Sequence, residues 1–347
     1  MNPRYDKIAL TIKRKIARGA LSANGRLPSR NELLRMVGGS KSTLQKGMSL
    51  LKAEGFIRSR GRNGTFVTAT PPNISNIPVI LQEYDGTAAS NRYFASITDN
   101  IRDIERVSGK KTPLFRIQNV KGKKDDFGKL QMLANSFRIQ GAIFASYPEG
   151  DWMLEPLMRN NIPTVAFTEP GQWPGLYTVW GDYDDLIEKS LAFLRSKGCG
   201  RVGMLNSTRL PMKYIDHFYA RCSHHSLKTG PQWVHGVSTD RYGRQWIANL
   251  LALMFRNAEK PDAVLVTDEN ITPFVADAIT GTNVTAVSQS SLPKKSTHND
   301  SASIRYIGFD VIDIMSECIH SVVSAIPGTC THRTIAAKWA DEMSSVK

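Results

Sequence analysis

The sequence predicts an α/β protein of two parts: a small N-terminal helical domain that ends in a β-hairpin, and a larger domain with two lobes built on parallel sheets. Three observations predict this fold class. The chain of 347 residues is longer than a single domain usually is. Helical periodicity dominates residues 5–54. After residue 78, short apolar runs alternate with amphipathic stretches, as is typical of parallel sheets covered by helices on both faces.

Positive charge is concentrated at the N-terminus. Residues 1–70 contain fifteen Lys and Arg residues against three Asp and Glu residues, a net charge of +12, whereas the whole chain carries +14. Clustered positive charge indicates a polyanionic partner, because neutralising phosphates releases their condensed counterions. An anionic membrane surface could use the same charge. A folded basic domain favours duplex DNA over a membrane as the partner, and the local sequence patterns predict such a domain.

Three helices are expected before residue 55. The first covers residues 5–16, where apolar side chains recur at helical spacing. A second follows Ser29, a good capping residue, and stops at two consecutive glycines. A third covers Lys41–Glu54, with Ser40 or Ser42 as its cap and a glycine as its stop.

The third helix is expected to have two different faces. At 100° per residue its apolar residues gather on one side, and its polar and basic residues gather on the other. The polar face holds Ser42, Gln45, Lys46, Ser49 and Lys52. That face is free to contact DNA.

Two short strands are expected after the third helix. The stretches FIRSR and TFVTA are rich in aromatic and β-branched residues, and the basic, glycine-containing turn GRNG joins them. Three helices followed by such a hairpin define a winged helix-turn-helix, in which the last helix enters the major groove and the wing contacts the backbone. Residues 1–70 are therefore expected to bind duplex DNA.

These residues resemble a known family. The stretches YDKIALTIKRKIARGAL, GRLPSRNELL, SKSTLQKGMSLLKAEGFI and GRNGTFV are similar to the DNA-binding domain of the GntR family of bacterial regulators along its whole length. The resemblance implies that the first residues of the third helix meet phosphates and base edges, and that Gly64 lets the wing approach the backbone. The full set of candidate DNA contacts is Arg30, Lys41, Ser42, Thr43, Gln45, Lys46, Arg60, Arg62 and Gly64.

Two positions depart from the family's pattern. Asn31 stands where Arg is usual after the LPS segment, with Arg30 beside it, and Gln45 stands where the reading helix often has Arg. Gln favours adenine in bidentate pairing whereas Arg favours guanine, so the sequence predicts an operator unlike those of better-known relatives. A plainer alternative is that Ser and Thr at positions 40–43 only cap the helix.

A proline-containing segment separates the two predicted domains. Residues 71–77 are expected to link a DNA-binding domain at 1–70 to an α/β domain at 78–347, since paired prolines stiffen a spacer. In the α/β domain, apolar runs such as PVILQ, LFRIQNV and GAIFAS alternate with helical stretches, including residues 91–107. The alternation restarts after Tyr177, which predicts two similar halves.

Two other segments of this domain lack such a pattern. Residues 281–303 are polar and rich in Ser and Thr, and they are expected to form a mobile loop between two strands. The segment from Pro327 onward is short, and its sequence assigns it no role.

Side chains at strand ends are the candidates for a ligand site. Ligands of open α/β sheets bind outside the carboxyl ends of the strands, and two facing halves form a cleft that can close on a small molecule. The candidates are Asp85, Asp182, Asp268 and Asp310, with Tyr93, Phe94, Trp173, Trp180 and Tyr214 as aromatic residues that could stack on a sugar or base. Each Asp could instead cap the helix that follows it, and each Trp could be a core residue.

Residues 77–325 resemble the effector domain of LacI-type repressors, which is similar to periplasmic sugar-binding proteins. The matching pieces include NRYFASITDNI, GDYDDLIEKSLAFLRSKGCGRVGML, PDAVLVTDEN and IRYIGFD. LacI-type sensors usually carry a ligand-clamping Arg in an RxxGF segment, whereas the corresponding region here reads MKYIDHF, with Lys213 or Tyr214 at the position of the Arg. The resemblance implies an effector cleft lined or flanked by Tyr93, Phe94, Asp182, Asp268 and Asp310, with Tyr214 as a further candidate.

Together these features predict a cytoplasmic, homodimeric transcription regulator: a repressor that binds a double-stranded DNA operator and is controlled by a small, sugar-like effector held between two α/β lobes. No cofactor, metal or catalytic residue is expected, because the four cysteines lack metal-ligand spacing, the adjacent His224 and His225 lack a third ligand, and GxSxG, HExxH and nucleotide-binding motifs are missing. No export signal or membrane segment is predicted.

Three alternatives stay open on the sequence alone. The chain could be a sugar-acting or group-transfer enzyme with a basic nucleic-acid-binding appendage. It could be a solute receptor of a transporter, although the basic N-terminus argues against export. It could also be an architectural DNA-binding protein that responds to no effector.

Overall fold

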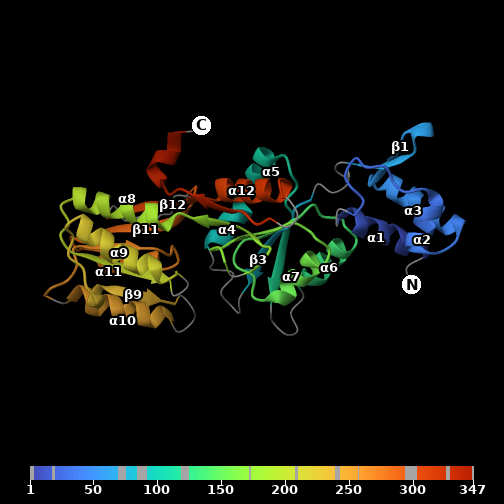
Figure 1. Ribbon diagram of the computed structural model, residues 1–347. Helices are drawn as coiled ribbons and strands as arrows, with labels where there is room; N and C mark the ends of the chain where they lie inside the picture. Colours follow the sequence, from blue (N-terminus) through green and yellow to red (C-terminus); the bar gives the residue numbers. More distant parts are fainter. Residues whose placement is uncertain are drawn as a thin grey trace. The chain divides into compact units, whose positions relative to one another are not determined.

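The computed structural model shows an α/β protein with a helical N-terminal part (Figure 1). The structure describes residues 4–17, 20–68, 76–83, 92–118, 125–171, 173–207, 210–238, 243–256, 258–293, 303–325 and 329–345. The chain divides into two compact units. The first unit contains Met1–Glu83, Glu105–Thr178 and Cys318–His332, and the second contains Tyr84–Ile104, Val179–Glu317 and Arg333–Lys347.

The N-terminal part of the first unit, residues 4–67, is called the head below. Its elements are α1 (Arg4–Ala17), α2 (Arg30–Val37), α3 (Lys41–Ala53), β1 (Ile57–Ser59), the 3₁₀ turn η1 (Gly61–Asn63) and β2 (Thr65–Val67) (Figure 1). The two strands pair antiparallel, with Ile57 opposite Val67. This order of elements is a winged helix-turn-helix, as the sequence predicts.

Capping side chains fix where α2 and α3 begin. The Ser29 N–H donates to Glu32 Oε2 at 2.7 Å, and the Glu32 N–H donates to Ser29 Oγ at 3.4 Å, so the two residues form a reciprocal capping box. At α3 the Thr43 N–H donates to Ser40 Oγ at 3.1 Å. The predicted cap Ser29 is confirmed, and of the two candidates for the third helix the cap is Ser40.

A hydrophobic core joins the three described helices and the wing. Gly47 lets α3 approach α1 closely, because a Cβ at this position would lie 3.1 Å from the Tyr5 carbonyl oxygen. Phe137, which lies outside the head in the chain, packs into this core and has a backbone φ of 55°. The core consists of Ile8, Ala9, Ile12, Leu21, Leu27, Leu33, Leu44, Leu51, Phe56, Ile57, Val67 and Phe137.

The first sheet follows the head in the chain. Its strands are β3 (Val79–Glu83), β4 (Leu114–Gln118), β5 (Ala142–Phe144), β6 (Thr164–Phe167), β7 (Tyr177–Gly181) and β13 (His332–Ile335), in the spatial order β13-β7-β6-β5-β3-β4. Strands β4, β3, β5 and β6 run parallel. Of the predicted linker, residues 71–75 lie outside the described part, Asn76 forms a bridge with Lys111, and Ile77 is buried.

Helices α5 (Ile101–Ser108), α6 (Phe127–Asn135) and α7 (Asp151–Met158) accompany the first sheet. Helix α6 and helix α7 bury Leu130, Ala134, Leu154 and Leu157 against the strands. Trp173 packs at the edge of the same core, so its position matches the core alternative rather than a stacking platform.

The second sheet belongs to the second unit and repeats the same design. Its strands are β8 (Val202–Ser207), β9 (Val234–Val237), β10 (Ala263–Val266), β11 (Thr285–Leu292), β12 (Ile304–Asp310) and β14 (Lys338–Trp339), in the order β14-β12-β11-β10-β8-β9. All the pairs between β9 and β12 are parallel, and β14 adds antiparallel to β12 at the edge. The predicted pair of similar halves is confirmed.

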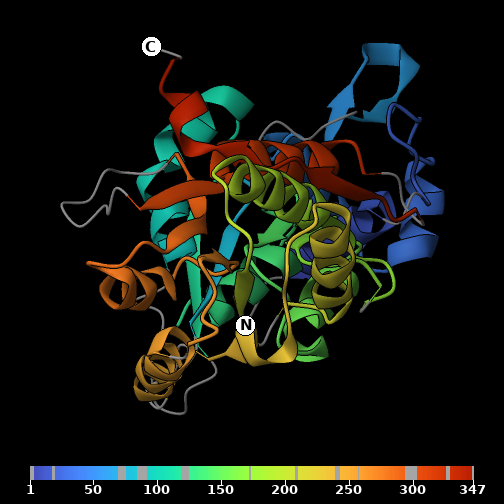
Figure 2. The same cartoon turned by 90° about the vertical axis from the view of Figure 1, so that its left-hand side faces the viewer.

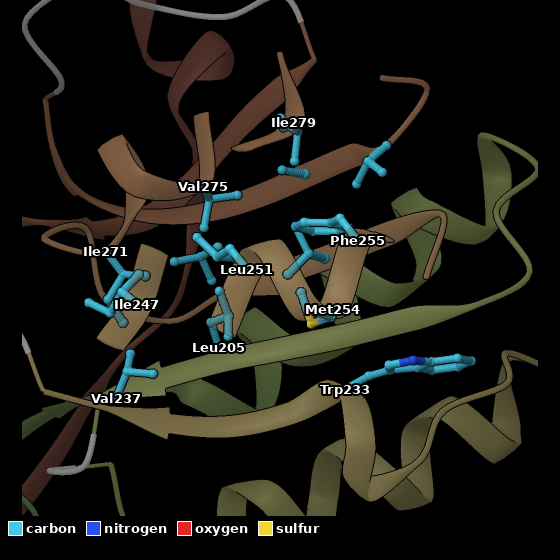
Figure 3. Packing of buried hydrophobic residues seen from close by; sticks show 14 of the residues in the cluster. Leu205, Trp233, Val237, Ile247, Leu251, Met254, Phe255, Ile271, Val275 and Ile279 are labelled. Atoms are coloured by element: carbon cyan, nitrogen blue, oxygen red, sulfur yellow. The ribbon is translucent and has the colours of Figure 1, made fainter. Parts of the chain in front are cut away.

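Helices flank the second sheet (Figure 2). They are α4 (Arg92–Asp99), α8 (Tyr183–Ser196), α9 (Lys213–His224), α10 (Gly243–Arg256) and α11 (Thr272–Ile279), with 3₁₀ turns η3 (Pro231–Trp233) and η4 (Ala340–Ser345). Helix α12 (Val311–Val323) follows β12, and its residues from Cys318 onward belong to the first unit. Figure 3 shows side chains of α10, α11 and β8, among them Leu251, Val275 and Leu205, in one apolar cluster.

Two sequence expectations are wrong. Residues 281–303 are not one loop, because β11 occupies Thr285–Leu292; its buried hydroxyls are paired, as in the contact of 2.5 Å between Ser288 Oγ and Thr272 Oγ1. The expected helix at 91–107 is two helices, α4 and α5, with Asn100 between them. Its side-chain amide donates to the Ser96 carbonyl at 2.8 Å, a local bond that competes with continued helix.

Residues 329–345 contribute one strand to each of the two sheets. Strand β13 joins the first sheet and β14 joins the second. In the second unit, Lys189 Nζ donates to the Ala337 carbonyl at 2.7 Å. The Arg305 guanidinium lies 3.9 Å from the centre of the Trp339 ring and donates to the Asp341 carboxylate at 2.9 Å.

Candidate nucleic-acid interface and effector site

The exposed face of α3 carries the polar side chains that the sequence places there. Leu44, Gly47 and Leu51 are buried, and the opposite side faces solvent. The exposed residues of this face are Lys41, Ser42, Gln45, Lys46, Ser49 and Lys52. This division follows from the helical period, and it leaves three ammonium groups on one side of the helix.

Hydroxyl groups converge at the start of α3. Ser40 Oγ lies 2.9 Å from Ser42 Oγ and 2.8 Å from Thr43 Oγ1, in addition to capping the Thr43 N–H. Ser40 is therefore the cap, while Ser42 is exposed and Thr43 is half-buried. The capping alternative accounts for Ser40 and leaves the Ser42 side chain at the surface.

A hydrogen bond that sequence reasoning missed joins α2 to α3. Arg30 Nη2 donates to Gln45 Oε1 at 2.8 Å, and both side chains are exposed. The two residues are fifteen positions apart on different helices, so no local pattern could have indicated their contact. Both are candidate DNA contacts, and the structure brings them together.

The wing presents further basic residues. The Arg60 guanidinium lies 4.9 Å from the centre of the Phe66 ring, and Arg62 is exposed in the turn η1. Gly64 has a φ of 101°, and a Cβ there would lie 2.8 Å from Nε of Arg26. Glycine is required for both reasons.

A hollow of about 680 Å³ lies between α2, α3 and the wing. Arg26, which the sequence prediction omitted, lines it together with Arg30, Gln45, Lys52 and Gly64. The Glu32 carboxylate also lines the hollow, where it accepts from the Ser29 N–H in the capping box, while Glu54 pairs with Lys13. Positive charge thus predominates around a concave surface.

In the second unit, the candidate aspartates hold the starts of helices or turns. Asp182 Oδ1 accepts from the Asp185 N–H at 3.0 Å, at the start of α8. Asp268 Oδ1 accepts from the Asn270 N–H at 2.9 Å, and Asp310 Oδ1 accepts from the Ile312 N–H at 2.8 Å. These bonds match the capping alternative, and burial raises the pKa of the Asp310 carboxyl.

Tyr214 is a buried member of an aromatic cluster. Its hydroxyl accepts from Trp180 Nε1 at 3.0 Å, and its ring centre lies 5.4 Å from that of Tyr183. Tyr183 also lies edge-on to Phe309, at 5.2 Å between ring centres. Desolvation and the nearby Asp268 carboxylate raise the pKa of Tyr183. Tyr183, which the sequence analysis did not select, therefore contacts the Tyr214 ring and lies near enough to Asp268 for that carboxylate to affect its pKa.

Tyr93 and Phe94 lie on α4, which contacts β11 within the second unit. Phe94 is buried and Tyr93 is half-buried, with 5.8 Å between their ring centres. The Arg92 N–H donates to Asn270 Oδ1 at 3.5 Å, so α4 begins beside the turn that contains Asp268. Asp85 lies outside the described residues.

A second buried acid stands next to Asp268. Glu269 is 7 % exposed and accepts from the N–H of Ser291 at 2.9 Å and from its hydroxyl at 2.5 Å. Burial raises the pKa of Glu269. The sequence analysis missed this residue because its partner comes from β11, a strand it did not predict.

Within the described ranges, His, Cys, Asp and Glu side chains form no group of three or more that could hold a metal ion. His225 Nε2 lies 2.9 Å from Glu188 Oε1. The described helices also include none that is long and apolar enough to cross a membrane.

Sequence comparison bears on the head. Residues 4–67 match the family model of bacterial regulatory proteins, gntR family. The uncharacterized HTH-type transcriptional regulator YdcR of Escherichia coli K12 is 24% identical over 194 residues, which are 49% of this chain and 41% of YdcR. The HTH-type transcriptional regulator Rv1152 of Mycobacterium tuberculosis is 27% identical over 86 residues, 25% of this chain and 71% of that protein. The chain thus spans well under half the length of YdcR.

Structure comparison bears on the α/β part. A LacI transcriptional regulator from a Rhodococcus species has a TM-score of 0.58 at 14% identity, covering 76% of this chain and 96% of that one. A LacI-family regulatory protein from Chloroflexus aggregans has a TM-score of 0.58 at 12% identity, with the same coverage. A LacI-family sugar-binding transcriptional regulator from Escherichia coli has a TM-score of 0.52 at 12% identity, again over 76% and 96%.

The head and these comparisons define a DNA-binding domain joined to an α/β domain with the fold of LacI-type regulators. The N-terminal domain is a GntR-family helix-turn-helix domain. Both resemblances seen in the sequence are confirmed: the head to the GntR family, and the α/β domain to the fold of LacI-type regulators.

Proposed function

We propose that the protein is a transcription regulator that binds a double-stranded DNA operator through residues 1–70 and responds to a small metabolite through residues 78–347, with residues 71–77 as the connection. The observation that carries the proposal is the exposed, basic face of α3 beside the wing in a GntR-family domain. We propose no catalytic role. Operator binding would place the protein in the cytoplasm.

The DNA contacts follow from exposure and charge. Lys41, Lys46 and Arg62 would neutralise phosphates, because they are exposed and a cation releases counterions from DNA. Ser42 and Thr43 would donate to phosphates at the start of the helix. Gln45 would face base edges in the major groove, while Arg60 and Gly64 would bring the wing to the backbone.

The effector site would lie at the carboxyl ends of the strands of the second sheet. The turn with Asp268 follows β10, and Asp310 ends β12, both in the second sheet, whereas Asp182 follows β7 of the first sheet and caps α8. Tyr93, Phe94 and Tyr214 contribute the aromatic surface. One structural neighbour is described as sugar-binding, and we extend that ligand class, a sugar or a derivative, to this chain. We propose that effector binding lowers operator affinity, as in a repressor released by its ligand.

An exposed apolar face supports a homodimer. Trp246 and Leu253 lie seven residues apart on one side of α10 and are 74% and 75% exposed. On another side of α10, a separate groove of about 410 Å³ between α10 and α11 is lined by Leu251, Phe255 and Phe274. Large apolar side chains gathered on one surface are typical of protein contacts. A dimer would present two heads to an approximately palindromic operator.

The DNA-binding part is tested by fluorescence anisotropy with a labelled, randomised duplex at a series of salt concentrations. If the proposal is correct, the logarithm of the association constant falls linearly with the logarithm of the salt concentration. Binding to no duplex, or binding that does not depend on salt, would contradict it.

The effector part is tested separately by thermal-shift screening of sugars and their phosphates, followed by repetition of the anisotropy titration with each compound that binds. A ligand that raises the melting temperature and weakens duplex binding supports the proposal. A ligand that stabilises the protein without changing duplex affinity would contradict regulation by that ligand.

A further inference from the structure

We propose that Arg30 and Gln45 act together as one base-reading unit, which selects guanine at one position of the operator. This inference rests on the proposed DNA-binding function and identifies the base that the reading helix prefers. It replaces the expectation, drawn from Gln45 alone, that adenine is read at this point.

The two side chains are joined before any DNA is bound. Arg30 is the first residue of α2, and its Nη2 donates to Oε1 of Gln45 on α3 at 2.8 Å. Both side chains are exposed and line the hollow between α2, α3 and the wing. The bond therefore places the positively charged guanidinium of Arg30, which belongs to α2, at the exposed face of α3.

Both side chains belong to helices whose starts are held by capping hydrogen bonds. The capping box between Ser29 and Glu32 sets the backbone next to Arg30, and Ser40 caps α3 one turn before Gln45. Because the Glu32 carboxylate accepts from the Ser29 N–H, it is occupied within the cap. A contact group held by rigid elements loses little freedom when it binds.

The bond changes what Gln45 can offer to a base. A free Gln reads adenine by accepting from N6–H with its oxygen while its amide donates to N7. Here the oxygen already accepts from a guanidinium, whose positive charge disfavours a second donor beside it. The groups left for DNA are the Gln45 amide N–H and the remaining N–H groups of Arg30, since Arg has donors and no acceptor.

A surface made of donors fits guanine better than adenine. In the major groove guanine presents two acceptors, N7 and O6, whereas adenine presents one acceptor and one donor. The pair thus supplies from two helices the donor pattern that a single Arg supplies elsewhere. Positions 30 and 45 are expected to specify the same base pair.

The test selects sites from a randomised duplex library with the full chain, and then measures the affinity for every single-base variant of the enriched duplex at one salt concentration. The wild-type protein is expected to prefer guanine about tenfold at one base pair. Arg30→Met should shift the preference at that base pair towards adenine, because it releases the Gln45 oxygen. Gln45→Met should reduce the preference at the same base pair, and the double variant should lose no more than Gln45→Met does.

Arg62→Met is the matched control, because Arg62 is a basic and exposed residue of the wing. It should weaken binding to all bases equally. Methionine is unbranched and has a helix propensity close to those of Arg and Gln, and unchanged melting temperatures would show that the variants fold.

Three outcomes would overturn the pairing: adenine at that position in the wild-type site, effects of the two substitutions at different base pairs, or an equal loss on every base with Arg30→Met. A wild-type protein with no salt-sensitive affinity for any duplex would instead refute the proposed function itself. The two failures are therefore distinguishable.

Discussion

Lys13 Nζ lies 2.5 Å from Glu54 Oε2, and this ion pair ties the middle of α1 to the end of α3. The Lys13 side chain is only 6% exposed, and its ammonium also lies 4.8 Å from the centre of the Phe56 ring. It donates in addition to the Ser136 carbonyl at 3.3 Å. A nearly buried ammonium thus holds together the end of the reading helix, the first helix and the loop after α6.

Replacing Lys13 by Ala is expected to destabilise the protein by about 3 kcal/mol, because removal of one partner leaves the Glu54 carboxylate half-buried and unpaired. Urea denaturation followed by circular dichroism measures the loss. Arg14→Ala, at an exposed neighbouring position, is the control. The double variant Lys13→Met with Glu54→Leu should recover part of the stability, and an unchanged midpoint for Lys13→Ala would show that the pair contributes nothing.

Because Glu32 accepts a capping hydrogen bond at the start of α2, the protein is expected to lose stability in acid. Hydrogen bonds from Ser29 hold the pKa of Glu32 below its usual value of 4.5. For an acid whose pKa is lower in the folded state, the stabilisation is complete above the unfolded pKa and is lost as the pH falls through the folded value. Stability should therefore decline below pH about 4.5, and Glu32→Gln should remove this part of the decline. Equal acid sensitivity of the two proteins in thermal melts between pH 3 and 7 would sink the prediction.

Glu269 predicts the opposite pH dependence in the second unit. Burial raises its pKa, so the charged form is disfavoured in the folded protein and stability falls as the pH rises above 4.5. Glu269→Gln should raise the melting temperature at neutral pH and have a smaller effect at pH 4.5, since the glutamine oxygen can accept from the Ser291 N–H while its amide donates to the Ser291 hydroxyl. Glu259→Gln, at an exposed position, provides the control. A lower melting temperature at neutral pH would indicate that the charge itself is needed.

Removal of the Lys41 side chain is expected to change the salt dependence of DNA affinity. It is exposed at the start of α3, where a phosphate contact would be independent of sequence. Lys41→Ala should weaken binding to all duplexes and reduce the slope of log affinity against log salt by about 1. Lys260→Ala, at an exposed site in the second unit, should leave the slope unchanged. An unchanged slope in both variants would exclude a phosphate contact by Lys41.

Local patterns predicted most of the head. The cap at Ser29, the bounds of α3 and the hairpin follow from residues within a few positions of one another, and the structure agrees with each. The Arg30–Gln45 bond could not be predicted in this way, because its geometry depends on how α2 packs against α3.

The second domain shows where such patterns are insufficient. The alternation of apolar runs and helices predicted two halves correctly. Strand β11 was missed because its buried positions hold Ser288, Ser290 and Ser291, and the hydroxyls of Ser288 and Ser291 are paired by Thr272 and Glu269, which lie far from them in the chain. The same error concealed Glu269, and Tyr183 was overlooked because its three aromatic neighbours come from separate segments.

Strand β14 protects the second sheet from self-association. It occupies the edge next to β12, with Trp339 opposite Ile307, and Arg305 clamps it by contacts to Trp339 and Asp341. A chain cut after residue 336 would present the unpaired N–H and C=O groups of β12 to other molecules, and an uncovered edge of this kind recruits further strands. Shortened versions of this protein should therefore precipitate even where the remaining residues still fold.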